Sequence, residues 1–435
     1  MTTVPKQEAS LVVTMTTIRK AQPLLLYPSC SSLSTYYFPL LLLLLPLSLN
    51  SCHFCAITRR RKKGKEIMSS DSGLALPENP IILGFGGAGV DFLAAVPSFP
   101  KPDAKIRTTQ LKVQGGGNAA NALTCAARLG LKPRIISKVA NDSPGKAVLD
   151  ELEADGVDTS FFVVSKEGTS PFSYIIVDSQ TKTRTCIFTP GYPPMVPEDL
   201  SRANLLSALD GARMVYFDAR MPDSALVIAQ EAFRQNISIL IDAERPREGL
   251  NDLLPLADYI VCSEKFPQAW TKASSIPKAL VSIILRLPRL KFVIATLGKD
   301  GCIMLEKCVD DEDSDLEEMD VDSCLTSLRR RMDDSTAMPT CIASSVTKFR
   351  AEGIGSMCGR LYFGTAEKIP PSELIDTTGA GDAFVGAVLY AICANLSPEK
   401  MLPFASYVAS IKCRALGARS GLPYRTNACL KSFTK

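Results

Sequence analysis

Strand and helix signals alternate along this chain from about residue 80, and this alternation constrains the fold more than any other feature. Short apolar runs of strand length lie at 80–83, 134–139, 214–217, 238–241, 259–262 and 292–296. Segments with helical spacing lie at 118–129, 143–156, 223–235, 276–287 and 383–396. Two further runs, 173–177 and 184–188, flank a polar turn and predict a β-hairpin. We therefore predict an α/β fold, a three-layer sandwich with helices on both faces of a mostly parallel central sheet.

Charge and histidine content narrow the function classes. Residues 1–65 hold nine Lys/Arg and one acid, whereas the remainder holds 40 Lys/Arg and 44 Asp/Glu. The body is thus mildly acidic, which disfavours nucleic acid as a partner. The only histidine, His53, lies in the N-terminal segment. A Ser-His-Asp triad or a His-ligated zinc therefore cannot be built in the body, and catalysis must use carboxylates, Lys, Arg, Cys, backbone amides or a cofactor.

Residues 1–68 are predicted to be a targeting segment. They are rich in Ser, Thr and Leu, almost free of acids, and contain the basic run 59–63. This composition favours a transit peptide, with the plastid as the first destination. The leucine run 40–45 makes a signal peptide or signal anchor the rival, although it is too short for a stable membrane span. Translation from Met68, which would leave the protein cytoplasmic, is the third alternative.

Residues 308–355 interrupt the alternation. The tract holds nine acids between Asp310 and Asp322, followed by three arginines at 329–331. We find no apolar period in it and expect a disordered surface insertion. A regulatory or partner-binding loop is the alternative.

The segment Asp376–Phe384 carries the strongest chemical signal. Its sequence, DTTGAGDAF, leads through a Gly-Ala-Gly turn into an apolar helix. Small residues at a helix start leave backbone N–H groups bare, and together with the positive end of the helix dipole they form an anion site. An aspartate fixed beside such a site, Asp382, suits proton transfer during phosphoryl transfer.

Two glycine-rich segments precede it. Gly84–Gly89 contains G-x-G-x-x-G after a strand, but the following residues do not predict a helix and no acid ends a second strand at the expected distance. Two interpretations are open, a dinucleotide-binding site and a flexible strand end that delivers Asp91 into a cleft. We favour the flexible strand end. Gly115–Asn121 opens a helix, and Asn118 and Asn121 share one helix face. Their amides suit a ligand rich in hydroxyl groups.

Together these strings resemble the ribokinase/PfkB family of carbohydrate kinases. Asp91, the segment 116–121, the segment 296–301 and Asp376–Asp382 occur in the family's order, and the resemblance covers the chain from about residue 80 to 424. It implies a kinase domain over 78–435 with a small β lid at about 92–114 and 172–188. Four strings, at 106–107, 184–185, 244–248 and 412–413, look most like the ketohexokinase branch, which phosphorylates fructose.

The resemblance also implies roles for individual residues. Asp382 would be the catalytic base, and Gly379, Ala380 and Gly381 would form the anion hole. Asp91, Gly117, Asn118 and Asn121 would hold the sugar, with Arg184 approaching the phosphates from the lid. Thr296, Gly298, Gly301 and Thr378 would shape the nucleotide site. The implied cofactors are ATP and Mg²⁺, and a homodimer could form through the lid.

Two departures limit the carry-over. Many relatives have an Asn-x-x-Glu motif near the metal, whereas the matching region here reads CSEKF at 262–266, so we assign no metal ligand. The loop 417–421 could line a K⁺ site, but its residue types do not require one. A ketohexose or similar sugar is the expected acceptor. A nucleoside or pseudouridine kinase, a catalytically inactive plastid scaffold and an oxidoreductase built on Gly84–Gly89 are the alternatives.

Overall fold

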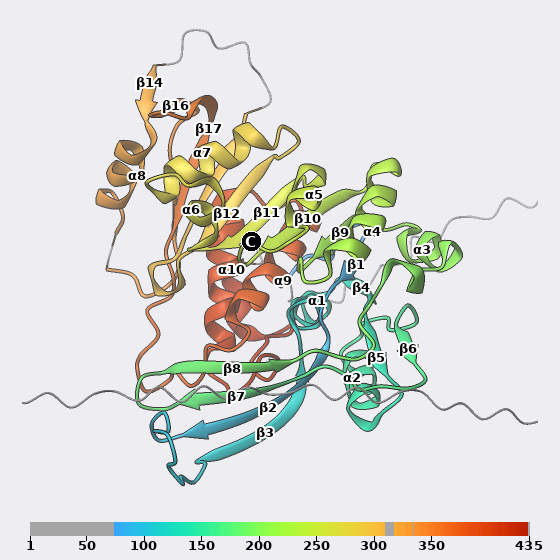
Figure 1. Cartoon of the computed structure of the whole chain (residues 1–435). Helices are drawn as coiled ribbons and strands as arrows, with labels where there is room; N and C mark the ends of the chain where they lie inside the picture. The colour runs from blue at the N-terminus through green and yellow to red at the C-terminus, as the bar shows by residue number, and fades with distance from the viewer. Residues whose placement is uncertain (1–73, 309–316, 334, 434–435) are drawn as a thin grey trace, which may run out of the picture. The chain divides into compact units, whose positions relative to one another are not determined.

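A computed structural model describes residues 74–308, 317–333 and 335–433 of the chain. The predicted targeting segment lies outside the described residues. The main sheet has the strand order β14-β16-β17-β13-β12-β11-β10-β9-β1-β4, with β15 paired to β17 (Figure 1). From β4 to β12 all neighbours are parallel, and β12–β13, β13–β17, β16–β17 and β15–β17 are antiparallel. The predicted α/β fold with a mostly parallel central sheet is confirmed.

The bounds of the sheet strands follow the apolar runs of the sequence. They are β1 Ile81–Phe85, β4 Lys132–Ile136, β9 Met214–Phe217, β10 Ser238–Ala243, β11 Tyr259–Ser263, β12 Phe292–Thr296, β13 Cys302–Lys307, β14 Glu318–Asp320, β15 Cys341–Ala343, β16 Thr347–Ala351 and β17 Gly355–Gly364. Strand β1 lies between β4 and β9, so the order of the strands reverses at β1, with β4 on one side and β9 and β10 on the other. In an α/β sheet such a reversal opens a crevice at the carboxyl ends of the strands, where ligands bind.

Helices cover both faces of this sheet. On one face lie α1 Asn118–Arg128, α2 Ser143–Ala154, α9 Ala380–Cys393 and α10 Pro398–Lys412. On the other lie α3 Arg202–Leu209, α4 Pro222–Arg234, α5 Leu250–Leu253, α6 Phe266–Thr271, α7 Ile276–Arg286 and α8 Val321–Arg330. Alternate strand residues serve the two cores: Ile82 packs with the α1 and α9 side, whereas Leu83 and Phe85 pack with the α4 side. These two apolar layers account for the stability of the sandwich.

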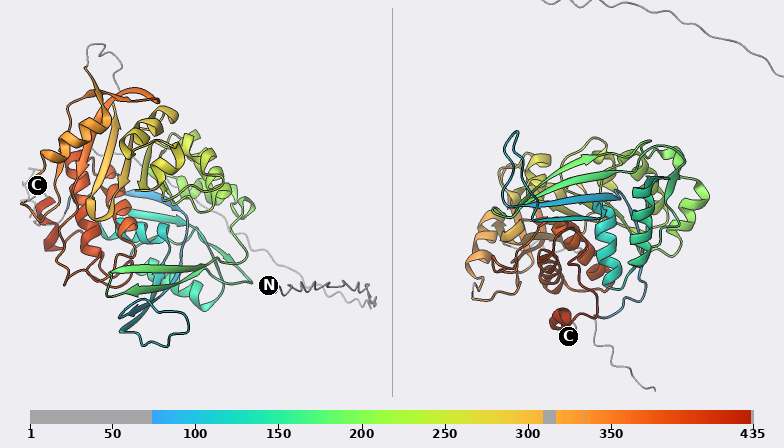
Figure 2. Two further views of the ribbon diagram at one scale, coloured as in Figure 1. Left: turned by 60° about the vertical axis from the view of Figure 1, so that its left-hand side comes forward. Right: turned by 90° about the horizontal axis from the view of Figure 1, so that it is seen from below.

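A second sheet of four strands, β3-β2-β7-β8, adjoins the first (Figure 2). Its strands are β2 Gly89–Val96, β3 Gln110–Gly116, β7 Phe172–Asp178 and β8 Thr183–Thr189. They overlap the two ranges expected for the lid, and β7 and β8 form the predicted antiparallel hairpin. The small two-stranded sheet of β5 Lys138–Ala140 and β6 Val163–Ser165 lies apart from it. Within the described ranges, no helix has the length and apolar character needed to span a membrane.

The expected disordered insertion is wrong for the part of it that the structure describes. The acidic residues 310–315 lie outside the described residues, but Asp320 caps α8 by accepting a hydrogen bond from the Ser323 N–H (2.9 Å). The helix buries Val321, Leu325 and Leu328 in the core. Their spacing of four and three residues is helical. We missed it because nine flanking acids and three arginines mask a short apolar stripe.

Candidate active site

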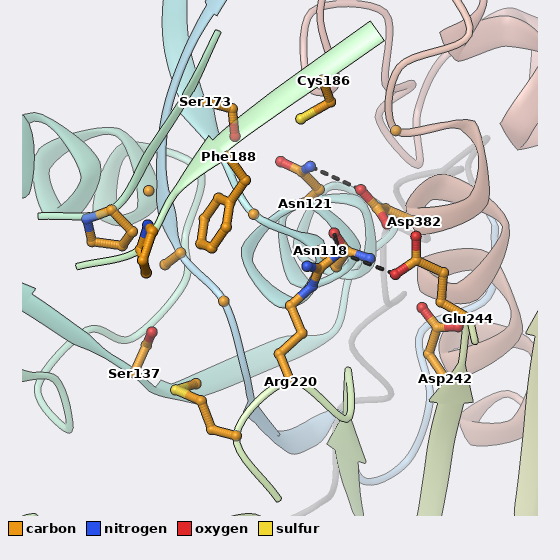
Figure 3. Close-up of a pocket in the computed structure, with 18 of the residues that line it drawn as sticks. Asn118, Asn121, Ser137, Ser173, Cys186, Phe188, Arg220, Asp242, Glu244 and Asp382 are labelled. Atoms are coloured by element: carbon orange, nitrogen blue, oxygen red, sulfur yellow. Dashed lines mark hydrogen bonds and ion pairs between the residues drawn. The ribbon is translucent and has the colours of Figure 1, made fainter. Parts of the chain in front are cut away.

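A cavity of about 810 Å³ lies at the carboxyl ends of β1, β9, β10, β11 and β12, between the main sheet and the four-stranded sheet. Elements far apart in sequence contribute to its wall, from Gly87 after β1 to Val385 in α9. Figure 3 shows Asn121 of α1 directly beside Asp382 of α9, with Asn118 of the same helix nearby. The sequence therefore places its strongest chemical signals around one space.

Asp382 lies in the first turn of α9 and is half-buried. One of its oxygens, Oδ2, accepts a hydrogen bond from the Asn121 side-chain amide (2.8 Å). Burial raises the pKa of Asp382 to about 6, and the Asn121 hydrogen bond and the charge of Arg220 partly offset that rise. A carboxylate with this pKa is ionised at neutral pH yet basic enough to accept a proton.

The turn before Asp382 leaves several backbone N–H groups without a partner in the described chain. Gly379 begins α9 in the left-handed region (φ 75°), and Gly379 and Gly381 line the cavity. In the described chain, the backbone N–H groups of Gly379, Gly381 and Asp382 have no hydrogen-bond acceptor. The Ala380 N–H, however, donates to the Thr377 carbonyl (3.2 Å), and Ala380 does not line the cavity. Of the three predicted N–H donors, Ala380 is therefore already occupied, whereas the Asp382 N–H, which was not predicted, has no partner in the described chain.

Buried polar groups hold this turn in place. Asp376 accepts hydrogen bonds from the Thr378 N–H (2.9 Å) and the Gly417 N–H (2.8 Å). The buried Lys412 donates to the Asp376 carbonyl (2.7 Å). The side chain of Arg184, on β8, donates to the Thr377 hydroxyl (3.0 Å), so the four-stranded sheet contacts the anion turn directly.

The proposed sugar-binding residues, from β2 and the start of α1, form one wall of the cavity. Asp91, Gly117, Asn118 and Asn121 all line the cavity. No helix follows Gly84–Gly89; β2 does, and it carries Asp91 inward. Burial raises the pKa of Asp91 to about 6, offset by Arg419 and by a hydrogen bond from Ser173. Carboxylate, amide and hydroxyl groups together supply the donors and acceptors that a sugar requires.

The predicted nucleotide residues are only partly brought together. Thr296 and Thr378 line the cavity, whereas Gly298 and Gly301 do not. Gly298 and Gly301 lie in the turn between β12 and β13, with positive φ values of 61° and 89°. A side chain at Gly301 would meet the Gly364 carbonyl, so the tight turn alone accounts for this glycine.

Two arginines were missed by sequence reasoning. Arg419 is 1% exposed; its Nε donates to the Asn121 side-chain carbonyl (3.0 Å), and its Nη2 donates to the Gly116 carbonyl (3.1 Å). Arg220 donates through Nη2 to Asn118 Oδ1 (3.1 Å) and to Glu244 Oε2 (3.1 Å). Nothing local marks either residue in the sequence, because the contacts that define each one include partners distant in sequence, with 102 residues between Arg220 and Asn118 and 298 between Arg419 and Asn121.

Two carboxylates at strand ends, Asp218 and Asp242, were also missed. Asp218 follows β9 and accepts hydrogen bonds from the N–H groups of Gly87 (2.6 Å) and Ala119 (3.3 Å). Asp242 lies at the carboxyl end of β10 and lines the cavity near Glu244 (Figure 3). An acid directly after an apolar parallel strand was the available signal, since these strand ends meet at one edge.

Asp242 and Glu244 are the carboxylates that fit a divalent cation. Asp242 is 9% exposed, and among the described residues none donates a hydrogen bond to it or forms an ion pair with it. Burial, with the nearby charges of Asp382 and Glu244, raises the pKa of Asp242 well above its ordinary value. A buried carboxylate without a donor is stabilised by a cation, and Mg²⁺ prefers such oxygen ligands. Glu264, in the region that matches the relatives' metal motif, does not line the cavity.

Comparisons with known proteins agree with this geometry. The chain matches the pfkB family of carbohydrate kinases over residues 82–317 and 361–425. It is 25% identical to mouse ribokinase, covering 80% of this chain and 93% of that protein, and 21% identical to mouse ketohexokinase, covering 78% and 98%. Its fold is similar to that of Arabidopsis thaliana ribokinase in complex with ribose and ATP (TM-score 0.57, 20% identity, 83% of this chain and 100% of the other).

The fold is also similar to that of a ribokinase-like protein from Agrobacterium tumefaciens (TM-score 0.61, 23% identity, 82% of this chain and 97% of the other). The similarity to ketohexokinase is thus no greater than the similarity to ribokinase. All of these relatives are named as carbohydrate kinases. The chain belongs to the pfkB family of carbohydrate kinases and is an ATP-dependent sugar kinase.

Proposed function

We propose that this protein transfers the γ-phosphate of ATP to a hydroxyl group of a monosaccharide, with a ketohexose such as fructose as the first candidate. One observation carries the proposal. The half-buried Asp382 carboxylate adjoins backbone N–H groups of the α9 turn that have no partner in the described chain, and it shares a cavity with Asn118 and Asn121.

In this mechanism Asp382 accepts the proton of the sugar hydroxyl as that oxygen attacks the γ-phosphorus. The N–H groups of Gly379, Gly381 and Asp382 stabilise charge on the transferred phosphoryl group. General-base help contributes about 10²–10⁴-fold, and each anion-hole donor contributes a few kcal/mol. Arg184 lies beside the turn and would hold the phosphates from the side of the four-stranded sheet.

Bound Mg²⁺ would neutralise charge on the ATP phosphates, and Asp242 and Glu244 are the side chains that would hold it. Glu244 uses one oxygen, Oε2, for both Arg220 and Arg247. The Ser263 hydroxyl fixes its backbone by donating to the Glu244 carbonyl (2.5 Å). We keep K⁺ at the loop 417–421 as a secondary expectation.

The proposed preference for a ketohexose rests on the position in the structure of the segments that resemble ketohexokinase. Arg184, Glu244, Arg245 and Arg247, which belong to the strings similar to ketohexokinase, all line the cavity. Ribose is the principal rival, because ribokinases are prominent among the relatives. A nucleoside acceptor is a further rival, supported by a 26% identical nucleoside kinase from Methanothermobacter thermautotrophicus that aligns over 24% of this chain and 34% of that protein. An inactive scaffold is disfavoured because the base and the turn are both intact.

The exposed face of the four-stranded sheet supports a homodimer. Leu111, Val113, Tyr174 and Ile187 are each more than half exposed on β3, β7 and β8. Apolar side chains gathered on a sheet face suit a protein contact. We propose that two copies associate through this face, and we retain a plastid as the proposed location.

The test is a substrate screen with the full-length chain, ATP and Mg²⁺. ADP release would be measured with fructose, ribose, other monosaccharides, nucleosides and pseudouridine, and phosphorylated products would be identified by mass spectrometry. We expect a phosphorylated ketohexose with the highest kcat/KM. A preference for ribose would correct the acceptor, and no phosphorylated product from any acceptor would refute the proposed function.

A further inference from the structure

A second, smaller cavity of about 380 Å³ adjoins the active-site cavity, and we call it the side cavity. Pro246, Arg247, Leu250, Asn251, Ala269, Trp270, Lys272 and Arg286 line it. Three of these eight residues are cations, and none is an acid. Its volume falls in the range of small-molecule sites. We propose that the side cavity binds a small phosphate-bearing anion and that this anion regulates the acceptor site through Arg247.

The cations of the side cavity are available to a ligand. Lys272 ends α6, is exposed, and forms no ion pair with any described carboxylate. Arg286, near the end of α7, likewise has no carboxylate partner among the described residues. Its Nη2 donates to the Thr271 carbonyl (3.2 Å), which uses one of the five N–H groups of a guanidinium.

Trp270 holds Arg286 in place. The guanidinium lies over the indole ring, 5.4 Å from its centre, and Phe266 stacks on the same indole with ring centres 6.2 Å apart. The indole N–H donates to Asn251 (2.8 Å). A guanidinium fixed by stacking loses little freedom when it binds an anion, so the site is preorganised. Two oxygens of a phosphate can accept hydrogen bonds from two N–H groups of one guanidinium at the same time.

Arg247 connects the two cavities, since it lines both. On the active-site side its Nη2 donates to Glu244 Oε2 (2.7 Å). The same oxygen accepts from Arg220 (3.1 Å), which in turn donates to Asn118 in the sugar wall. Burial and the neighbouring charge of Arg220 lower the pKa of Arg247, which agrees with a crowded cation that an anion would stabilise.

The direction of the coupling follows from these contacts. An anion in the side cavity draws Arg247 away from Glu244. Glu244 then pairs with Arg220 alone, and Arg220 is drawn from Asn118. The sugar wall loses a fixed amide, so affinity for the sugar falls. By linkage, sugar binding weakens anion binding by the same factor.

The chain provides its own reporter, because Trp270 is its only tryptophan. The full-length protein would be titrated with potassium phosphate while tryptophan emission is recorded, with KCl at equal ionic strength as the blank. Glycerol phosphate in a second titration distinguishes a phosphate monoester from free phosphate. We expect a saturable change in emission. Lys272→Gln should weaken binding about tenfold, Arg286→Lys should weaken it less, and Lys146→Gln, an exposed lysine of α2 outside both cavities, should leave it unchanged.

A kinetic arm tests the coupling separately. Phosphate should raise the sugar KM about fivefold or more in the wild type and in Lys146→Gln but not in Lys272→Gln, whose kinetics without phosphate should match the wild type. Phosphate acting at the anion turn would affect all three proteins equally, which would overturn the coupling. An emission change that persists in Lys272→Gln, or that KCl reproduces, would overturn the site itself. An unchanged sugar KM despite Lys272-dependent binding would overturn the role of Arg247.

Discussion

The starts of α1 and α9 are built from similar sequence but do different work. Each helix follows a glycine with positive φ, Gly117 at 93° and Gly379 at 75°, and neither glycine provides a side-chain cap. At α1 the first N–H groups are occupied: Ala119 donates to Asp218 and Ala120 to the Gly87 carbonyl (3.2 Å). At α9 the N–H groups of Gly381 and Asp382 have no partner in the described chain.

The difference shows how one local pattern yields two functions. Asp218 is a built-in anion at the α1 start, so that helix presents only its side-chain amides to the cavity. The α9 start lacks such an anion and can accept a phosphate. The two starts meet in the Asn121–Asp382 hydrogen bond, where the amide side of the site contacts the acid side.

Removing the α9 acid should have the largest effect. Asp382→Asn should lower kcat by about 10³-fold, within the range expected for a lost general base, while ATP binding persists. Steady-state kinetics and calorimetric ATP titration would measure the two. Turnover within tenfold of wild type would exclude Asp382 as the base.

The same variant should be more stable than the wild type. The pKa of Asp382 is about 6 in the folded protein and 3.8 as the ordinary value, so ionisation disfavours the folded state at neutral pH. That penalty is relieved as pH falls through about 6. Asn carries no charge, and we expect a gain on the order of 1–3 kcal/mol at pH 8 that disappears below about pH 4. Urea unfolding at both pH values checks the sign.

The glycines of the α9 turn separate structural from catalytic requirements. A Cβ at Gly381 would meet nothing within 4 Å, whereas one at Gly379 would lie 2.6 Å from the Ala418 Cβ. Gly381→Ala should therefore fold normally but lower kcat/KM for ATP by about 10–100-fold, because the methyl group occupies the anion site. Gly379→Ala should lower the unfolding temperature instead. Equal unfolding temperatures for the two variants would contradict this division.

Substitution of Asp242 tests whether this carboxylate holds the Mg²⁺ that would neutralise the charge of the ATP phosphates. Asp242→Asn should raise the Mg²⁺ concentration needed for half-maximal rate by about tenfold or more, and should weaken Mn²⁺ binding measured by electron paramagnetic resonance in the presence of ATP. Glu264→Gln, which removes the acid of the region matching the family motif, is the control and should change neither. The reverse result would move the metal site to the β11–α6 connection.

The smallest effect concerns the contact between the two helix starts. Wild-type kcat/KM should fall tenfold per pH unit below about 6, where Asp382 becomes protonated, and level off above it. Asn121→Ala removes a hydrogen bond that lowers the pKa of Asp382, so the midpoint should move up by about one unit. Asn118→Ala should raise the sugar KM without moving the midpoint. A midpoint that stays fixed in Asn121→Ala would show that the amide does not tune the base.

Local patterns predicted the parts of the site that are local. Asp382, its glycine turn and the Asn118–Asn121 pair lie within short strings, and the strand–helix alternation predicted the fold. Arg220, Asp242 and Arg419 were missed because their roles arise only when strand ends and loops distant in sequence meet. Helix α8 was missed because its surrounding charge masks four buried residues.

The environment of Asn121 has a consequence for regioselectivity. Its carbonyl accepts from the buried Arg419, so its amide nitrogen necessarily faces Asp382 and occupies Oδ2. Oδ1 is the oxygen that the amide leaves free, so a sugar hydroxyl would most readily deliver its proton there, from one side of the carboxylate. Which hydroxyl reacts is therefore limited by the orientation of one amide as well as by the walls that surround the sugar.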